Sequence, residues 1–161
     1  MPTDIIWRRF GDGIVTVNQG LPRFPKESKT TKGQKVPGIY RLTLNNGYTY
    51  IGKAGDLPQR FGNYRKPTQG TEQEYIVHYA LTEAGGATVD VITDGDLTCG
   101  SVLSMLEKAA IQAATGRLLN KRKGQPIDPY YLRLKIRYHT AMLADTAKAL
   151  AALEGSESTS E

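Results

Sequence analysis

The chain has 161 residues, of which 39% are hydrophobic and 23% charged, as expected for one globular domain large enough to bury a core. No apolar run approaches the roughly 20 residues that cross a bilayer, and the N-terminus lacks a signal-peptide pattern. We therefore expect a cytoplasmic protein that makes no membrane contact. One cysteine, Cys99, excludes an internal disulfide, and two histidines are too few for a zinc site of the usual spacing.

The net charge of +5 is distributed unevenly along the chain. Residues 1–70 and 108–138 are basic, whereas residues 71–107 carry seven acidic and no basic residues. Clustering of lysine and arginine predicts a face that binds a polyanion such as DNA. The alternative to a DNA-binding face, on the evidence of charge alone, is a basic surface patch that has no binding role.

The first 36 residues give the least regular pattern. Residues 5–7 could begin a short strand or helix, and residues 14–17 could form a strand. We expect residues 20–34 to be a loop, because they are rich in proline, lysine, serine and threonine. Lysines in and beside this loop are candidates for a DNA-contacting arm, with a solvated connector as the alternative.

A β-hairpin and a helix are predicted over residues 38–66. Residues 38–44 and 48–53 alternate branched or aromatic residues with polar ones around Asn46-Gly47, which favours a two-residue hairpin turn. Small residues follow, and Asp56 is the expected N-cap of a helix that runs to about residue 66. This arrangement brings five side chains close together: Tyr40, Tyr50, Lys53, Arg60 and Tyr64.

Three further helices and one strand are predicted after the hairpin. Thr71 and Glu74 fit a capping box that opens a helix ended by Gly85-Gly86, and residues 87–93 form a third strand. An apolar stripe predicts a helix over residues 100–115. Asp128-Pro129 predicts the start of a helix that continues to Leu153, before a disordered tail at residues 155–161.

Two tripeptides carry a family resemblance. Gly38-Ile39-Tyr40 is followed nine residues later by Tyr50-Ile51-Gly52, and an arginine, Arg60, lies on the next predicted helix. This composite pattern resembles the signature of GIY-YIG nucleases over residues 37–121. The resemblance implies an α+β fold with a three-stranded antiparallel sheet flanked by helices. Residues 1–36 and 122–154 would then be an N-terminal extension and a C-terminal helical extension of one compact domain.

The resemblance also implies roles for individual residues. Glu107, the only acid on the helix over residues 100–115, corresponds to the family's metal-binding carboxylate, and Asn120 to its downstream asparagine. Tyr40 would accept a proton from the attacking water or hold that water in position. Lys53, Arg60 or the metal would favour the phenolate form of Tyr40. Two further tyrosines belong to the same site. Tyr50 would orient the phosphate, and Tyr64 stands where many members carry histidine.

Phosphodiester hydrolysis requires groups that this sequence can supply. Arg60 is a permanently charged bidentate donor for phosphate oxygens. A single carboxylate suits Mg²⁺, which keeps most of its waters, and Mn²⁺ could substitute for it. We therefore expect a metal-dependent endonuclease that cleaves double-stranded DNA. The residues expected to contact DNA are Lys32, Lys35, Arg65, Lys66, Arg117, Lys121, Arg122 and Lys123.

The biological role is open to three interpretations. The resemblance is greatest to small restriction endonucleases of the family, which act beside a cognate DNA methyltransferase. A phage or mobile-element endonuclease is the second interpretation, and a non-catalytic nucleic-acid-binding module is the third. One active site cuts one strand, so a restriction enzyme would act as a homodimer. Residues 142–153 and the N-terminal segment are candidate dimer surfaces, although the apolar residues 142–153 could instead complete the core.

Overall fold

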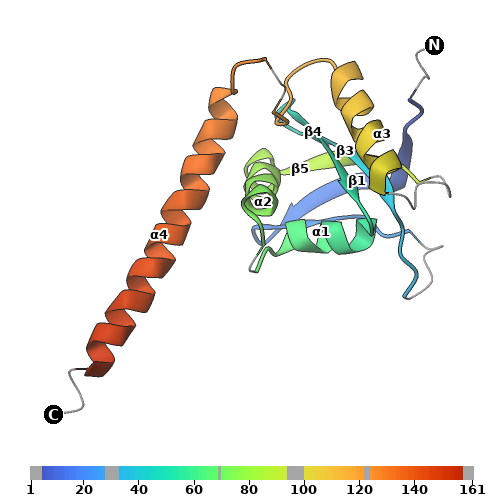
Figure 1. Ribbon diagram of the computed structural model, residues 1–161. Helices are drawn as coiled ribbons and strands as arrows, with labels where there is room; N and C mark the ends of the chain where they lie inside the picture. Colours follow the sequence, from blue (N-terminus) through green and yellow to red (C-terminus); the bar gives the residue numbers. More distant parts are fainter. Residues whose placement is uncertain (1–4, 28–32, 69, 94–99, 122–123, 158–161) are drawn as a thin grey trace. The chain divides into compact units, whose positions relative to one another are not determined.

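The computed structural model describes the chain except for residues 1–4, 28–32, 69, 94–99, 122–123 and 158–161 (Figure 1). The chain divides into two compact units, residues 1–126 and 127–161. The first unit is an α+β fold, and the second contains one long helix. Among the described residues, no helix is both long enough and apolar enough to span a membrane.

The first unit is built on a curled antiparallel sheet of five strands in the order β2-β1-β5-β3-β4. The strands are β1 (Arg8–Asn18), β2 (Leu21–Arg23), β3 (Gly38–Leu44), β4 (Thr49–Ala54) and β5 (Gly86–Ile92). The predicted hairpin is confirmed as β3 and β4, and the predicted third strand is β5. β4 lies at one edge of the sheet, where Thr49 forms an isolated parallel bridge with Leu118.

The expectation of a three-stranded sheet was wrong, because the N-terminal segment adds β1 and β2. The predicted strand at residues 14–17 is part of β1, which is much longer, and β2 lies within the segment that we expected to be a loop. Gly11 and Gly13 both have positive φ, and the pairing of β1 with β5 shifts register between Arg9 and Ile14. Such a bulge interrupts the two-residue alternation that identifies a strand in a sequence.

Helices cover both faces of the hairpin. The first unit contains α1 (Leu57–Arg65), α2 (Glu72–Ala84) and α3 (Gly100–Ala113). On one face, the Tyr40 ring contacts Phe61 of α1. On the other face, Ile39 and Ile51 form a core cluster with Leu103 of α3. Neighbouring residues of a strand point to opposite faces, so the order Ile39-Tyr40 places α1 and α3 on opposite sides of the hairpin.

The predicted N-cap residues are found at the starts of α1 and α2, but the side chains of Asp56 and Glu74 make hydrogen bonds other than those expected. Asp56 is the N-cap of α1, but its carboxylate accepts a hydrogen bond from the Val36 amide (3.2 Å) instead of capping the helix. Thr71 caps α2 by accepting from the Glu74 amide (3.4 Å), and Gly85 ends the helix in the left-handed conformation. The Glu74 side chain does not complete the expected capping box, since it bonds to α1.

A buried carboxylate joins three strands on the α3 face of the sheet. Asp90 of β5 pairs with Arg41 of β3 (2.9 Å) and with Arg9 of β1 (3.0 Å). The Arg41 guanidinium also lies 4.7 Å from the centre of the Trp7 ring. Because Asp90 is buried, removing either arginine would leave its charge less compensated, so these pairs help to hold the N-terminal strand on the sheet.

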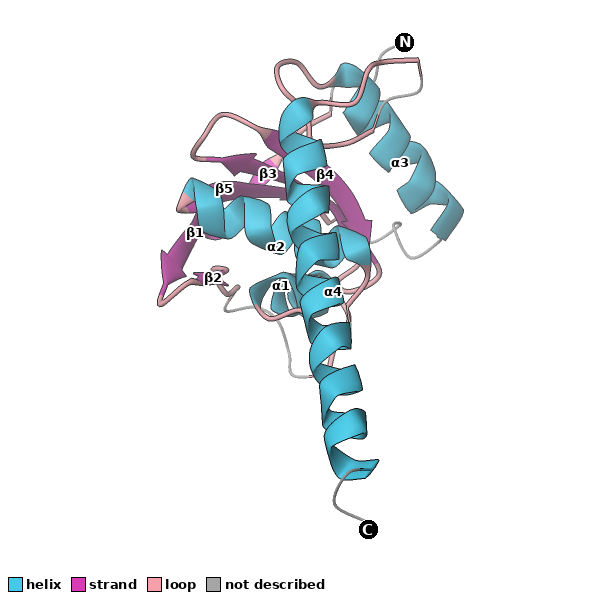
Figure 2. Ribbon diagram, turned by 90° about the vertical axis from the view of Figure 1, so that its left-hand side faces the viewer, coloured by secondary structure: helices cyan, strands magenta, loops and turns pink. Residues whose placement is uncertain are grey.

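The second unit consists mainly of α4 (Pro129–Glu157), the long helix seen in Figure 2. The expected start is confirmed, because the Asp128 carboxylate accepts from the Tyr130 amide at 2.8 Å. The helix continues beyond Leu153 and includes Gly155, so residues 155–157 of the expected tail are helical. A glycine within a helix is only about 1 kcal/mol less favourable than an alanine, and Gly155 therefore does not end α4.

Candidate active site

Two residues of the paired tripeptides fit together across the hairpin. Tyr40 of β3 is directly opposite Gly52 of β4. A Cβ built on Gly52 would overlap the Tyr40 hydroxyl and ring, so any larger residue at position 52 would displace the tyrosine. Gly38 has a similar role, because a Cβ there would lie 2.6 Å from the Ile92 carbonyl oxygen. Both glycines therefore permit close approach of neighbouring groups.

The three predicted site tyrosines form one hydrogen-bonded cluster on the α1 face of the sheet. The Tyr40 and Tyr64 hydroxyls are hydrogen-bonded to each other, and the Tyr50 hydroxyl bonds to Tyr64 and to Gln73 of α2. Tyr40 and Tyr64 are 1% exposed, whereas Tyr50 is 8% exposed. Tyr50 is therefore the member of the cluster closest to solvent.

Burial keeps these hydroxyls protonated. Desolvation is the main cause that raises the pKa of Tyr40 and Tyr64 well above 10, and it also raises the pKa of Tyr50. Arg60 acts in the opposite direction on all three residues, but its effect is smaller than that of burial. At neutral pH the cluster is thus a chain of neutral hydroxyls, and the phenolate expected for Tyr40 is not its resting form.

Arg60 is held beside this cluster by an acidic residue of α2. Its Nη1 lies 3.2 Å from Oε1 of Glu74, and the same oxygen accepts from Asn63 Nδ2 at 3.2 Å. The Arg60 side chain is 35% exposed, whereas that of Glu74 is 10% exposed. Glu74 therefore anchors one end of the guanidinium while other donors remain accessible to a ligand.

Lys53 and Glu107 meet on the other face of β4. Lys53 Nζ donates to Ser104 Oγ of α3 at 2.6 Å and lies 3.5 Å from Oε2 of Glu107. The charge of Glu107 also contributes to the raised pKa of Tyr50, after the larger effect of burial. The predicted site residues thus surround the edge strand β4, with the tyrosines and Arg60 on one face and Lys53 and Glu107 on the other.

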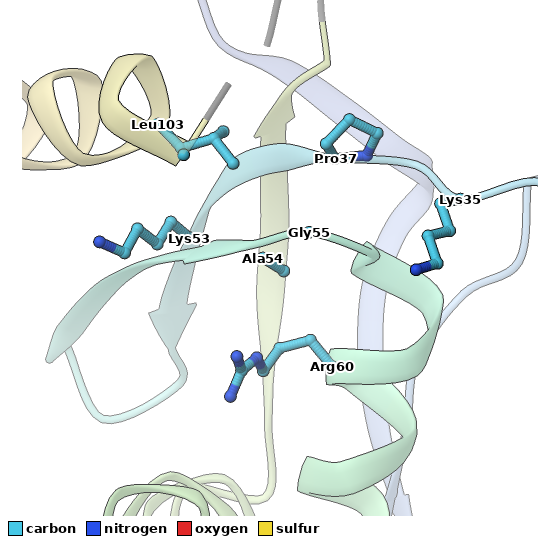
Figure 3. Close-up of a pocket in the computed structure, with 8 residues that line it drawn as sticks. Lys35, Pro37, Lys53, Ala54, Gly55, Arg60 and Leu103 are labelled. Carbon is cyan, nitrogen blue, oxygen red and sulfur yellow. The ribbon is translucent and has the colours of Figure 1, made fainter. Parts of the chain in front are cut away.

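A cavity of about 540 Å³ lies at this edge (Figure 3). Among the residues that the structure describes, three cationic side chains line it, each from a different segment: Lys35 precedes β3, Lys53 belongs to β4, and Arg60 belongs to α1. The other described lining residues are small or apolar, and none of them is acidic. Such a lining favours an anionic group such as a phosphate.

Asn120 supports β4. Its amide donates to the Ile51 carbonyl oxygen (2.6 Å) and accepts from the Ile51 amide (2.9 Å). The preceding residues extend the sheet edge, because Thr49 exchanges backbone hydrogen bonds with Arg117 and Leu119, each at 2.9 Å. Asn120 is therefore a positioning residue for the strand that carries Tyr50 and Lys53.

The residues expected to contact DNA are only partly brought together. Lys35 lines the cavity, and Arg117 and Lys121 are exposed on the segment that follows the β4 edge. Arg65 and Lys66 are exposed at the end of α1, where Arg65 lines a second cavity beside Phe24 and Phe61. Three further predicted contacts lie outside the described residues: Lys32, Arg122 and Lys123.

Sequence reasoning missed four residues that support the site. Gln73 bonds to Tyr50, Glu74 holds Arg60, and Ser104 holds Lys53. The fourth residue is His78, whose Nδ1 is hydrogen-bonded to the Tyr64 carbonyl oxygen (2.7 Å). Nδ1 is the donor in this bond, because a carbonyl oxygen can only accept. Only Ser104 has a clear sequence signal, since it lies three residues before Glu107 on the same helical face.

Glu107 fits an Mg²⁺ ion that retains most of its waters. Its side chain is 24% exposed and offers a hard carboxylate donor. No group of three or more acidic, histidine or cysteine side chains that could enclose a metal is found in the part of the chain that the structure describes. The donor set therefore suits a metal that takes most of its ligands from water and substrate.

Comparisons of the chain with protein-family models, with curated proteins and with solved structures found no significant match.

Proposed function

We propose that this chain is a metal-dependent endonuclease of the GIY-YIG type that hydrolyses phosphodiester bonds in double-stranded DNA. The main support is the meeting of three kinds of group at one edge of the sheet. These groups are the cationic cavity, the hydroxyl cluster around Tyr40 and the carboxylate of Glu107. Each has a function in phosphodiester hydrolysis, and the paired tripeptides explain why they occur together.

Arg60 is the main phosphate-binding group in this proposal. Its guanidinium faces the cavity, and the carboxylate of Glu74 restricts its position. Restriction of this kind lowers the entropy lost when the arginine binds an anion. Lys35 supplies a second positive charge to the same cavity. Together they stabilise the additional negative charge that develops on phosphate oxygens in the transition state.

The tyrosine cluster positions the attacking water. Tyr50 is the most accessible member, so its hydroxyl contacts the water or the phosphate. Hydrogen bonds with Tyr64 and Gln73 hold the Tyr50 hydroxyl in place, and Tyr64 is in turn bonded to Tyr40. Because burial raises all three pKa values, the hydroxyls stay protonated and orient the water, and the proton that the water loses passes to solvent.

Glu107 would hold Mg²⁺, or Mn²⁺ in its place. When bound, the cation lowers the pKa of a bound water and offsets negative charge on the phosphate. Lys53 contacts Glu107 at 3.5 Å and is exposed enough to turn toward DNA when the carboxylate takes a metal. Ser104 offers Lys53 an alternative hydrogen-bond partner on the same helix.

Sequence-specific cleavage of the restriction type is the role that we favour. Restriction enzymes of this family carry their specificity elements around the nuclease core. In this chain, β1 and β2 precede the hairpin in the sequence and α4 follows it, so these elements are candidates for that role. A cognate DNA methyltransferase would then protect host DNA. A phage or mobile-element endonuclease has the same site chemistry and differs in its cleavage pattern.

Cleavage of supercoiled and linear plasmid DNA in Mg²⁺, followed by sequencing of the new ends, tests the proposal. Discrete double-strand breaks at one sequence would support the restriction role. Scattered or structure-dependent nicks would support the mobile-element role. Binding of DNA without cleavage in either Mg²⁺ or Mn²⁺ would reject the endonuclease and leave a nucleic-acid-binding module.

A further inference from the structure

One side of α4 carries an exposed apolar strip with heptad spacing. Its apolar members are between 42% and 71% exposed. They are Leu132, Ile136, Leu143, Leu150 and Leu153. The intervals are those of positions a and d of a coiled coil, with His139 and Thr146 at the two remaining seam positions. At 1.5 Å per residue the heptad strip extends over roughly 32 Å, about three heptads.

The heptad strip is not the buried side of α4. The buried residues of this helix are Tyr130, Tyr131 and Leu134. Successive residues are separated by about 100° around a helix, so Leu134 and Ile136 point in nearly opposite directions. A seam that is apolar, regular and exposed is characteristic of a helix that pairs with another helix.

We propose that α4 pairs with α4 of a second copy of this chain in an antiparallel, two-stranded coiled coil. The charges of the helix favour this partner. Its first part carries Arg133, Lys135 and Arg137, whereas residues 140–157 carry three acidic residues and one lysine. In an antiparallel pair, the basic part of each helix lies beside the acidic part of its partner.

The heptad positions define the register of the pair. Aligning the a positions of one helix with the d positions of its partner gives three different layers on each side of the twofold axis between residues 136 and 153, and Leu132 lies beyond them, opposite the partner's Glu157. The layers are Ile136 with the partner's Leu153, Leu143 with the partner's Thr146, and Leu150 with the partner's His139. In the same register, Arg133 and Glu154 both occupy e positions and face each other between the two helices. The dimer therefore has two equivalent Arg133–Glu154 pairs, as twofold symmetry requires.

A parallel pair fits the sequence less well. In a parallel pair, His139 and Thr146 would each lie opposite the same residue of the partner helix. The three basic residues at the start of α4 would also lie beside the same basic residues of the partner. Arg133 and Glu154 would then be about three heptads apart and could not interact. Charge complementarity thus selects the antiparallel arrangement.

Light scattering of the full chain over a concentration series tests the pairing. The mass should approach that of two chains, and Leu143→Lys with Leu150→Lys should weaken dimerisation at least about tenfold. The matched control is Ala144→Lys with Ala151→Lys, which adds the same charges outside the heptad strip and should leave the dimer intact. A one-chain mass at all concentrations, a four-chain mass, or equal effects of both double variants would overturn the proposal.

A charge exchange tests the orientation. Arg133→Glu alone and Glu154→Arg alone should each weaken dimerisation, because each places like charges together. The double variant should restore wild-type dimerisation, since the pair is rebuilt with reversed polarity. Failure of the double variant to recover would reject the antiparallel register. DNA cleavage is not needed for either experiment, so loss of the proposed nuclease activity would not affect the result.

Discussion

Gly52 lies directly opposite Tyr40 in the hairpin, and the space that a side chain at position 52 would occupy is filled by the Tyr40 ring and hydroxyl. The glycine of one tripeptide and the tyrosine of the other are therefore one structural unit. Their fit directs the Tyr40 hydroxyl toward Tyr64 of α1. The geometry of the hydroxyl cluster thus depends on the absence of a side chain in β4.

Substitution of Gly52 by alanine should displace Tyr40. Forcing an extra methyl group into a packed site typically costs roughly 1–3 kcal/mol. We expect Gly52→Ala to lower the free energy of unfolding by about that amount and to break the bond between Tyr40 and Tyr64. Chemical denaturation measures the first effect, and a crystal structure of the variant would show the second.

Gly62→Ala is the matched control, because a Cβ at that position of α1 meets no atom within 4 Å. Alanine in an exposed helix is preferred over glycine by about 1 kcal/mol, so this variant should be as stable as the wild type or more stable. Equal stability of both variants would show that the Gly52 position is not tightly packed.

Glu74→Gln should release Arg60. The exchange removes a charge but keeps the shape of the side chain, and we expect the unfolding free energy to fall by about 1–2 kcal/mol. This is less than for a fully buried ion pair, because Arg60 is 35% exposed and partly screened by solvent. Cleavage should also slow, and combining Glu74→Gln with Arg60→Lys should slow it no further than Arg60→Lys alone. Additive effects on the rate would show that Glu74 does not act through Arg60.

Arg60→Lys tests whether cleavage requires the planar guanidinium group of Arg60. Lysine keeps the positive charge but loses the planar fork that could contact two phosphate oxygens in the proposed complex, so we expect turnover to fall about 10²-fold or more while DNA affinity changes little. The measurement is single-turnover cleavage with saturating enzyme. A rate within two- or threefold of the wild type would exclude Arg60 from transition-state stabilisation.

Alkaline pH should destabilise the fold through the tyrosine cluster. The pKa values of Tyr40, Tyr50 and Tyr64 are higher in the folded chain than in the unfolded chain. Their contribution to stability is complete below about pH 10. It is lost above that pH, because the unfolded chain releases protons that the folded chain retains. Each group can add up to about 1.4 kcal/mol of destabilisation per pH unit.

Denaturation between pH 8 and pH 11 checks this expectation. Tyr40→Phe should reduce the loss of stability above pH 10. A wild-type unfolding free energy that stays constant between pH 10 and pH 11 would contradict the raised pKa values.

Local sequence patterns predicted the hairpin, all four helices and the central strand β5. These features depend on nearby residues, such as Asn46-Gly47 at the turn and Asp128-Pro129 at the start of α4. The resemblance to GIY-YIG nucleases also selected residues that meet in space, since Tyr40, Tyr50, Tyr64 and Arg60 interact in one cluster.

Features that depend on distant contacts were not predicted. β1 pairs with residues of β5 that are 70 to 83 positions away in the chain, and its bulge hides the strand pattern. Glu74 has the spacing of a capping box, so its contact with Arg60 of another helix could not be inferred from the local sequence. Gln73 lacks any local signal, because its hydrogen bond to Tyr50 depends on how α2 packs on the sheet.

Glu107→Gln offers the most direct test of the proposed endonuclease. The variant removes the charge that we propose to bind the metal and retains the shape of the side chain, and Glu83→Gln on α2 is the control for loss of one negative charge. Plasmid cleavage in Mg²⁺ and DNA affinity by fluorescence anisotropy would be measured on the same preparations. We predict that wild type and Glu83→Gln cleave DNA and are stopped by a chelator, whereas Glu107→Gln binds DNA with unchanged affinity but does not cleave it. Cleavage by Glu107→Gln at the wild-type rate would contradict the proposed role of this carboxylate, and the absence of cleavage by the wild type would contradict the endonuclease itself.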